Sequence, residues 1–238
     1  MRQSSLTVQS RTVRVDLESI SLRGDLTIPA NAPGIVVFAH GSGSSRLSGR
    51  NRFVAASLVQ AGIGALLVDL LTADEEHDRT NVFDIGLLAG RLRAITRWLL
   101  DRPEASELAL GYFGASTGGG AALVAAAQGN PSVAAVVSRG GRPDLAGKWL
   151  TKVTAPTLLI VGGQDLTVLE LNWMAYERMV CTKRLEVVPG ATHLFEEPGT
   201  LEVVAILAAN WFAKYLNQPE GASHASPRSG VRDDDRGY

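Results

Sequence analysis

Two kinds of apolar pattern follow one another along the chain. Near the amino terminus, residues 12–18 and 20–28 alternate apolar and polar side chains, which indicates strands with one face exposed to water. We expect these two strands to pair in antiparallel fashion at one edge of a sheet. Later runs are continuously apolar and rich in β-branched residues, as in strands that are covered on both faces. These runs are residues 34–40, 63–69, 108–114, 133–138, 156–162 and 184–189.

Segments with apolar residues at helical spacing lie between the buried runs. For the longest of them, Asn81 is the expected N-cap, Asp84 suits the first turn, and Pro103 closes the helix. The alternation of strands and helices predicts an α/β fold, with a mostly parallel, doubly wound sheet and helices on both faces. Residues 1–216 are expected to form a single domain. The predicted helices are residues 52–60, 81–100, 118–128, 166–179 and 201–216.

Composition narrows the class of protein. Residues 217–238 hold almost no large apolar side chain, so we expect them to form a disordered tail. The net charge of −1 argues against phosphate-driven binding of nucleic acid. The single cysteine, Cys181, excludes an internal disulfide and is expected to serve in packing. No segment has the pattern of a signal peptide or a membrane helix, so we expect a cytoplasmic protein without a membrane partner.

The strongest chemical signal is the sequence Gly-Ala-Ser-Thr-Gly at residues 114–118. It lies where a buried strand ends and a helix begins. A tight turn at this junction would lift the Ser116 hydroxyl off the sheet, and Gly114 and Gly118 remove the side chains that would collide there. A serine hydroxyl is a poor nucleophile near neutral pH, so a base has to take its proton.

His193 is the expected base. It lies after the last strand, on a loop at the carboxyl ends of the strands, where ligands bind in open α/β sheets. The acid that orients the histidine is expected to be Asp165, which also follows a buried strand. Asp69 is the alternative acid, because it ends a buried strand as well. Its competing role is to cap or pair the loop that follows.

These motifs resemble those of the α/β-hydrolase superfamily and, within it, most closely the dienelactone-hydrolase-like branch. The matching residues are 40–45 (HGSGSS), 114–118 (GASTG), 163–165 (GQD) and 190–193 (GATH). The resemblance implies Ser116 as nucleophile, Asp165 as acid and His193 as base. It also implies an oxyanion hole formed by the backbone N–H groups of Ser42 and Thr117, with His40 organising the turn.

This chain departs from the dienelactone hydrolases in one respect, because they use cysteine as the nucleophile. Ser116 therefore favours ordinary ester chemistry, namely hydrolysis of a small carboxylic ester or lactone through an acyl-enzyme. Acyl transfer and non-catalytic ligand binding on the same fold are the alternatives. No metal or cofactor is expected, and we expect a monomer or homodimer whose partner is the small-molecule substrate.

The segment after the sixth predicted strand bears on the substrate. Residues 139–155 leave room for little beyond one helix, so we expect an open site without a lid domain. Arg139 and Arg142 leave this strand at the catalytic end and could bind an anionic substrate group, because guanidinium forks bind carboxylates at two points. Pairing with Asp144, Asp69 or a helix terminus is the favoured alternative for both arginines. Arg46, Arg50 and Asn51 follow the 40–45 turn and could border the same cleft, but the favoured interpretation is that they are solvated residues before a helix. The acidic run 74–78 is interpreted as a solvated loop.

Overall fold

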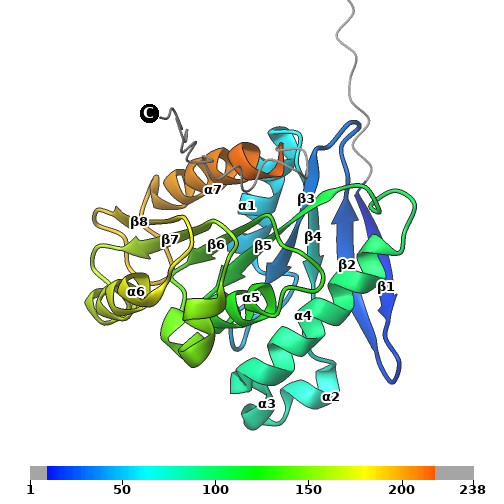
Figure 1. Cartoon of the computed structure of the whole chain (residues 1–238), viewed down its shortest axis with the longest axis horizontal. Coiled ribbons are helices and arrows are strands. Elements are labelled where there is room, and N and C mark those ends of the chain that lie inside the picture. The colour runs from blue at the N-terminus through cyan, green and yellow to red at the C-terminus, as the bar shows by residue number, and fades with distance from the viewer. Residues whose placement is uncertain (1–9, 218–238) are drawn as a thin grey trace, which may run out of the picture.

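The described part of the protein is an α/β structure built on a single sheet (Figure 1). The computed structural model describes residues 10–217, in which the strand order is β1-β2-β4-β3-β5-β6-β7-β8. β1 is antiparallel to β2 and β2 to β4, whereas all other neighbours are parallel. The predicted fold class and the antiparallel edge are therefore confirmed. The strands are β1 Ser10–Asp16, β2 Ser21–Thr27, β3 Gly34–Ala39, β4 Gly64–Val68, β5 Ala109–Ala115, β6 Ala135–Arg139, β7 Thr157–Gly162 and β8 Lys183–Val188.

Helices cover both faces of the sheet, as the sequence predicts. α1 and α7 pack on one face, and α4, α5, α6 and the 3-10 helix η1 pack on the other (Figure 1). The expected tail lies outside the described residues except for Asn217, so that expectation stays a prediction. The helices are α1 Gly49–Gln60, α2 Ala73–Glu76, α3 Arg79–Phe83, α4 Ile85–Leu100, α5 Thr117–Ala127, η1 Pro143–Lys152, α6 Leu166–Arg178 and α7 Thr200–Leu216.

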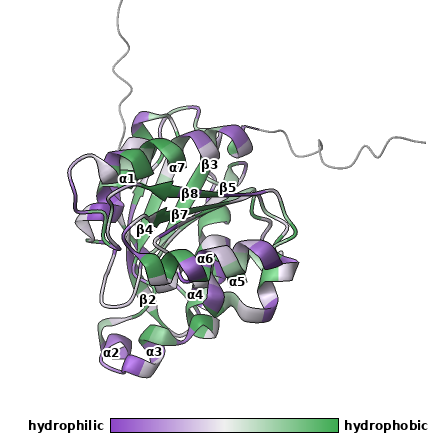
Figure 2. Cartoon of the chain, turned by 90° about the vertical axis from the view of Figure 1, so that its left-hand side faces the viewer, coloured by the Kyte–Doolittle hydropathy of each residue, from purple (hydrophilic) through white to green (hydrophobic). Residues whose placement is uncertain are grey.

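Two apolar cores sandwich the sheet because successive side chains of a strand point to opposite faces. In β3, Ile35 and Val37 belong to the core beneath α4 and α5, whereas Val36 and Phe38 belong to the core beneath α1 and α7. All four side chains are buried. Figure 2 shows the apolar colouring of the central strands between the two helical layers. Burial on both faces explains why these strands appear in the sequence as continuous apolar runs.

The segment between β4 and α4 differs from the prediction. The acidic run 74–78 is not a loop, because α2 forms there with a capping box in which Thr72 and Glu75 satisfy each other's backbone N–H groups. α4 is also shorter than predicted. Asp84, not Asn81, is its N-cap, since the Asp84 carboxylate accepts the Leu87 N–H at 2.9 Å. The short helix α3 takes up the residues assigned to the start of the longer helix.

The parallel strands bring the chemically interesting residues to one edge of the sheet. Ser116 follows β5, Arg139 ends β6, Asp165 follows β7 and His193 lies between β8 and α7. The turn of residues 40–45 follows β3 at the same edge. After β6 the chain forms only η1 before it enters β7, which agrees with the predicted absence of a lid domain. Within residues 10–217, none of the helices has the length and hydropathy needed to cross a membrane.

A buried pair of hydroxyl groups joins α4 to β5, the strand that leads into the Ser116 turn. The Thr96 hydroxyl donates to the Leu92 carbonyl at 2.7 Å and lies 2.9 Å from the Tyr112 hydroxyl. Since the Thr96 proton is already used, Tyr112 is the donor in the second bond. Both side chains are fully buried, and burial raises the pKa of Tyr112 to about 12.

This arrangement predicts unequal effects of two substitutions. Thr96→Val leaves the buried Tyr112 hydroxyl without an acceptor and should lower the free energy of unfolding by about 1–3 kcal/mol. Tyr112→Phe leaves Thr96 bonded to Leu92 and should cost less, about 0.5–1.5 kcal/mol. Urea unfolding of the two variants and the wild type measures both values. An equal or larger loss for Tyr112→Phe would contradict the assignment of donor and acceptor.

Candidate active site

Ser116 occupies a strained turn between β5 and α5. Its backbone has φ 52° and ψ −124°, a conformation that non-glycine residues rarely adopt. Three backbone hydrogen bonds hold it. The Ser116 N–H donates to the Arg139 carbonyl at 3.3 Å, and the Ser116 carbonyl accepts from the Gly119 and Arg142 N–H groups at 3.0 Å each. The end of β6 therefore fixes the backbone that carries the hydroxyl.

The two glycines that flank Ser116 are required by close backbone contact. A Cβ on Gly118 would lie 2.2 Å from the Ala39 carbonyl oxygen, and one on Gly114 would lie 2.5 Å from the Gly118 carbonyl oxygen. Both distances are shorter than real Cβ contacts. α5 thus begins directly against β3 and β5, which no residue with a side chain would permit at these two positions.

Asp165 and His193 meet at the same edge of the sheet. The His193 Nδ1 atom lies 2.6 Å from the Asp165 Oδ2 atom. Asp165 stands at the N-cap position of α6 but makes no side-chain cap bond, so its carboxylate serves the histidine instead of the helix. The Asp165 side chain is 14% exposed and the His193 side chain 38% exposed. Asp165 therefore holds the imidazole through Nδ1, and part of the ring remains exposed to solvent.

Asp69, the alternative acid, is engaged elsewhere. Its carboxylate accepts the Arg46 backbone N–H at 2.8 Å and the Arg46 Nη1 at 2.9 Å. A second carboxylate, that of Asp25, lies 3.6 Å from the Arg46 guanidinium. Asp69 therefore forms a salt bridge, as its competing role required, but its partner is in the segment after the 40–45 turn and not in the loop that follows Asp69. Arg46 is paired too and does not border the site as a free cation.

His40 organises the 40–45 turn through both ring nitrogens. The Leu70 backbone N–H donates to its Nε2 atom at 3.0 Å, and its Nδ1 atom lies 3.0 Å from the Gly41 carbonyl oxygen. Because a backbone N–H can only donate, Nε2 is the acceptor and Nδ1 carries the proton. With both nitrogens used in these contacts, His40 is held in one tautomer and is unsuited to act as a base.

The 40–45 turn also reaches the start of α5. The Ser42 backbone N–H donates to the Thr117 Oγ1 atom at 2.9 Å. The structure thus brings together the two residues whose amides were expected to form an oxyanion hole. In this conformation, however, the Ser42 amide is engaged by the Thr117 hydroxyl. That contact joins residues 75 positions apart, and no local sequence pattern predicts it.

Ser116 and His193 line one pocket of about 280 Å³. The other lining residues come mainly from the 40–45 turn, the start of α1 and the ends of β5 and β6. They include Ser42, Ser44, Ser48, Arg50, Asn51, Ala115, Arg139 and Leu194. A second pocket, of about 310 Å³, lies beside the same turn and is lined by Leu71, Glu76, Val82 and Leu88 in addition to residues 40–45. The 40–45 turn therefore contributes to both cavities, and α2 and α3 close one of them.

Arg50 and Asn51 lie within a helix and not before it, and the alternative prediction, that they border the cleft, describes them. α1 begins at Gly49 with Ser48 as its N-cap, so both residues lie in its first turn and line the pocket. Asn51 is only 2% exposed. A serine directly before the helical pattern is a typical N-cap, so Ser48 was the signal that could have placed the helix start correctly.

The two arginines after β6 differ sharply. Arg142 makes two 2.8 Å bonds to Asp144, which raise its pKa, so the favoured pairing interpretation describes it. Arg139 is 7% exposed and donates from Nη2 to the Asn51 Oδ1 atom at 3.3 Å. Its Nε and Nη1 atoms are buried without a partner among the described residues. Burial, with a smaller contribution from Arg50, lowers the pKa of Arg139 to about 10, so it is a cation at neutral pH.

Comparison with known proteins assigns the chain to a family. The sequence model described as "Dienelactone hydrolase family" matches residues 22–216. The crystal structure of a dienelactone hydrolase from Anabaena variabilis is 57% identical in sequence, with a TM-score of 0.85 over 87% of this chain and 98% of that chain. Est1E from Butyrivibrio proteoclasticus shares the fold, with 16% identity and a TM-score of 0.74 over 87% of this chain and 99% of that chain.

A curated relative carries a different name. A protein of Mycobacterium tuberculosis strain H37Rv, provisionally named a phosphoribosyl transferase, is 59% identical over 212 residues. The match covers 89% of this chain but 48% of that protein, so the chain spans about half the length of the curated relative.

The close packing of the Ser116 turn makes a prediction about two helical glycines. Gly118→Ala places a Cβ against fixed backbone oxygens and should lower the free energy of unfolding by more than about 3 kcal/mol. Gly90→Ala in α4 is the matched control, because nothing lies within 4 Å of the added Cβ. Alanine in a helix interior should there stabilise the protein by up to about 1 kcal/mol. Chemical unfolding compares the two variants, and a mild effect at Gly118 would show that α5 does not need this approach.

Proposed function

The chain belongs to the dienelactone hydrolase family, and from that premise we propose that it hydrolyses a small carboxylic ester or lactone through an acyl-enzyme on Ser116. Membership in the family and the related dienelactone hydrolase structure support hydrolysis. One observation carries the finer proposal. The Asp165–His193 hydrogen bond lies at the pocket into which the strained turn lifts Ser116.

The hydrogen bond decides which nitrogen acts as the base. A carboxylate only accepts hydrogen bonds, so the Nδ1 atom of His193 carries the proton and Nε2 is the basic nitrogen. In the proposed mechanism, Nε2 removes the Ser116 proton as the oxygen attacks the substrate carbonyl, and Asp165 stabilises the imidazolium that forms. His193 then protonates the leaving alcohol, and water releases the acyl group by the same steps.

The oxyanion is proposed to bind between the 40–45 turn and the N-terminus of α5. The Thr117 backbone N–H opens α5 and has no carbonyl partner within the helix. The Ser42 N–H, which now donates to the Thr117 hydroxyl, would be the second donor. When the tetrahedral intermediate forms, its oxygen takes the place of that hydroxyl as acceptor. Losing one such donor costs about 10²–10³ in rate in other hydrolases.

Serine is the proposed nucleophile because the cysteine of this chain is in the wrong place. Cys181 precedes β8, and its Sγ atom lies 3.9 Å from the Thr157 hydroxyl at the start of β7. Both residues are at the amino ends of parallel strands, across the sheet from Ser116. Burial raises the pKa of the Cys181 thiol, which disfavours the thiolate that a nucleophile needs.

The transferase name of the curated relative is not carried over to this chain. The matched region is about half of that protein, and the hydrolase family model accounts for residues 22–216 of the chain. We therefore assign the ester chemistry to the matched half. A cytoplasmic location and a monomer or homodimer belong to the same proposal. Acyl transfer would use the same acyl-enzyme with an alcohol in place of water, and product analysis in the presence of methanol separates the two reactions.

The proposed roles predict large and unequal losses of activity. With p-nitrophenyl acetate as substrate, Ser116→Ala should lower kcat by about 10⁴–10⁶-fold, because the nucleophile is removed. Asp165→Asn should lower kcat by about 10⁴-fold, because the amide no longer holds the required tautomer of His193. Steady-state kinetics measures both. Labelling of the wild type by a fluorophosphonate, followed by peptide mass spectrometry, should identify Ser116 as the modified residue.

Asp69→Asn is the matched control for the acid. It makes the same chemical change directly after β4, where the carboxylate pairs with Arg46 and not with a histidine. We expect kcat to stay within about tenfold of the wild type. A loss of kcat at Asp69 as large as that at Asp165, or full activity of Ser116→Ala, would reject the proposed assignment.

A further inference from the structure

Arg139 is a buried cation with unused donors inside the pocket of Ser116. Among the described residues, its Nε and Nη1 atoms have no partner, and the one hydrogen bond of its guanidinium is the 3.3 Å contact from Nη2 to Asn51. The guanidinium lies 5.8 Å from the centre of the buried Phe195 ring, which offsets part of the cost of burying the charge. A buried donor without an acceptor destabilises a protein, so a ligand that supplies acceptors is the simplest reason to keep it.

The rest of the pocket favours an anion with several oxygens. None of the described residues that line it is an aspartate or glutamate. Arg50 adds a second cation, whose Nη1 atom is 3.0 Å from the exposed Glu196. Ser48 caps α1 by accepting the Asn51 N–H at 3.4 Å, so the N–H groups of Gly49 and Arg50 are the donors of this 12-residue helix that have no helical carbonyl to bind. A helix N-terminus with adjacent arginine and serine side chains provides the donors and the positive potential that a phosphoryl group binds.

We propose that the substrate hydrolysed at Ser116 carries a phosphate monoester, which binds between Arg139 and the first turn of α1. This inference rests on the proposed function, because it names the class of ester. Three terminal oxygens suit the unpartnered Nε and Nη1 atoms of Arg139, which together carry three N–H groups, and the donors of α1, whereas a carboxylate offers two oxygens and one charge. The phosphate stays on the product, and only the acyl ester is cleaved.

The size of the pocket limits the substrate. The reacting residues Ser116 and His193 and the cations Arg139 and Arg50 line the same cavity of about 280 Å³. The phosphate therefore lies only a few bonds from the scissile carbonyl. A short acyl ester of a phosphorylated alcohol meets this requirement.

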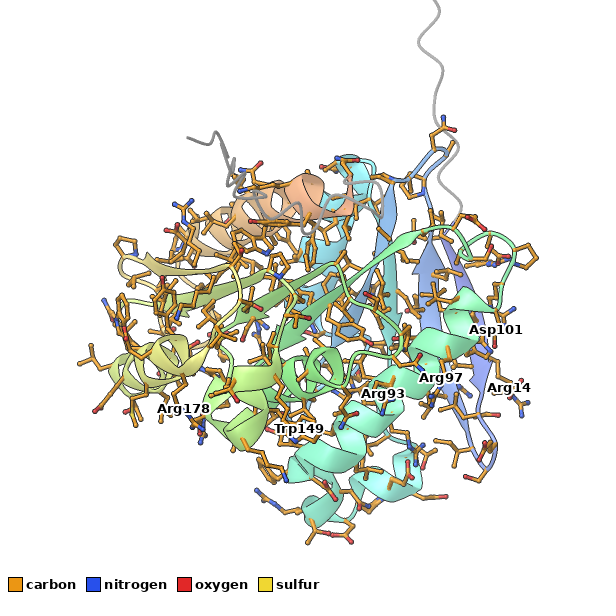
Figure 3. All side chains as sticks on the ribbon, in the orientation of Figure 1. Arg14, Arg93, Arg97, Asp101, Trp149 and Arg178 are labelled. Atoms are coloured by element: carbon orange, nitrogen blue, oxygen red, sulfur yellow. The ribbon has the colours of Figure 1, made fainter. Side chains whose placement is uncertain are left out.

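Binding of inorganic phosphate tests the ligand class apart from catalysis. Calorimetry at pH 7.5 should show binding to the wild type and to Ser116→Ala, and weaker or no binding of acetate. Arg139→Met should weaken phosphate binding about 10- to 100-fold, because charged hydrogen bonds are lost. Arg178→Met is the matched control. Arg178 ends α6 at the periphery of the molecule, where it donates to the Gly147 carbonyl (Figure 3), and its loss should leave binding unchanged.

Thermal unfolding provides a second readout that a purely structural role of Arg139 would not give. Without phosphate, Arg139→Met should unfold at the same temperature as the wild type or higher, because it removes a buried cation that has no carboxylate partner. Phosphate should raise the unfolding temperature of the wild type but not that of Arg139→Met. Arg139→Lys keeps the charge without the fork and should give an intermediate response.

Steady-state kinetics tests whether the phosphate site also recognises the ester substrate. 2-Acetoxyethyl phosphate should be hydrolysed with a higher kcat/KM than the neutral 2-methoxyethyl acetate, and this preference should disappear in Arg139→Met. Inorganic phosphate should compete with p-nitrophenyl acetate in the wild type.

Several outcomes would overturn the inference. They are equal affinity for acetate and phosphate, phosphate binding that survives Arg139→Met, a large loss of stability in Arg139→Met and Arg139→Lys, and phosphate that binds without competing. If no ester is hydrolysed while phosphate still binds through Arg139, the proposed function fails and the phosphate site stands. If esters are hydrolysed without preference for the phosphate, the inference fails and the proposed function stands.

Discussion

The close approach of α5 to the sheet is the constraint on which the site depends. Gly118 lies so near the Ala39 carbonyl that α5 has to begin directly after Ser116, and the turn between β5 and α5 has no room for relaxed backbone. The strain at Ser116 is held by bonds to the Arg139 carbonyl and the Arg142 N–H. The end of β6 consequently has two roles, because its backbone fixes the nucleophile turn while its Arg139 side chain enters the pocket beside that turn.

The parts of the structure that follow from local pattern were predictable. Eight apolar or alternating runs became eight strands, and residues that follow parallel strands met at one edge because the topology requires it. The choice of Asp165 over Asp69 was a preference in the sequence, and the structure supplies the physical difference. Asp165 leaves its helix uncapped and faces His193, whereas Asp69 is held by Arg46. Local sequence pattern alone does not identify these two pairs, because Asp165 and His193, like Asp69 and Arg46, lie far apart along the chain.

The missed features depend on caps and on side-chain pairing. The start of α1 was placed three residues late, so a position of Arg50 and Asn51 at the cleft was the less favoured alternative. The capping box at the start of the acidic run 74–78 was missed. A cluster of charges has the pattern of a solvated loop unless Thr72 is recognised as an N-cap. Arg139 and Arg142 looked equivalent in sequence. Only the position of Asp144 two residues after Arg142 on a turn separates a paired surface cation from an unpaired buried one.

The charges around the pocket also link substrate binding to chemistry. His193 has the Asp165 carboxylate behind it, whereas Arg139 and Arg50 line the cavity in front of it. Under the proposed mechanism, proton transfer from Ser116 to His193 creates an imidazolium together with the negatively charged oxygen of the tetrahedral intermediate, so the net charge of the site does not change. Among the described residues, no carboxylate pairs with the Arg139 guanidinium. A phosphate bound at Arg139 would neutralise that buried cation before the reaction begins. Its contribution is therefore to bind the substrate and to hold the scissile ester in position beside Ser116.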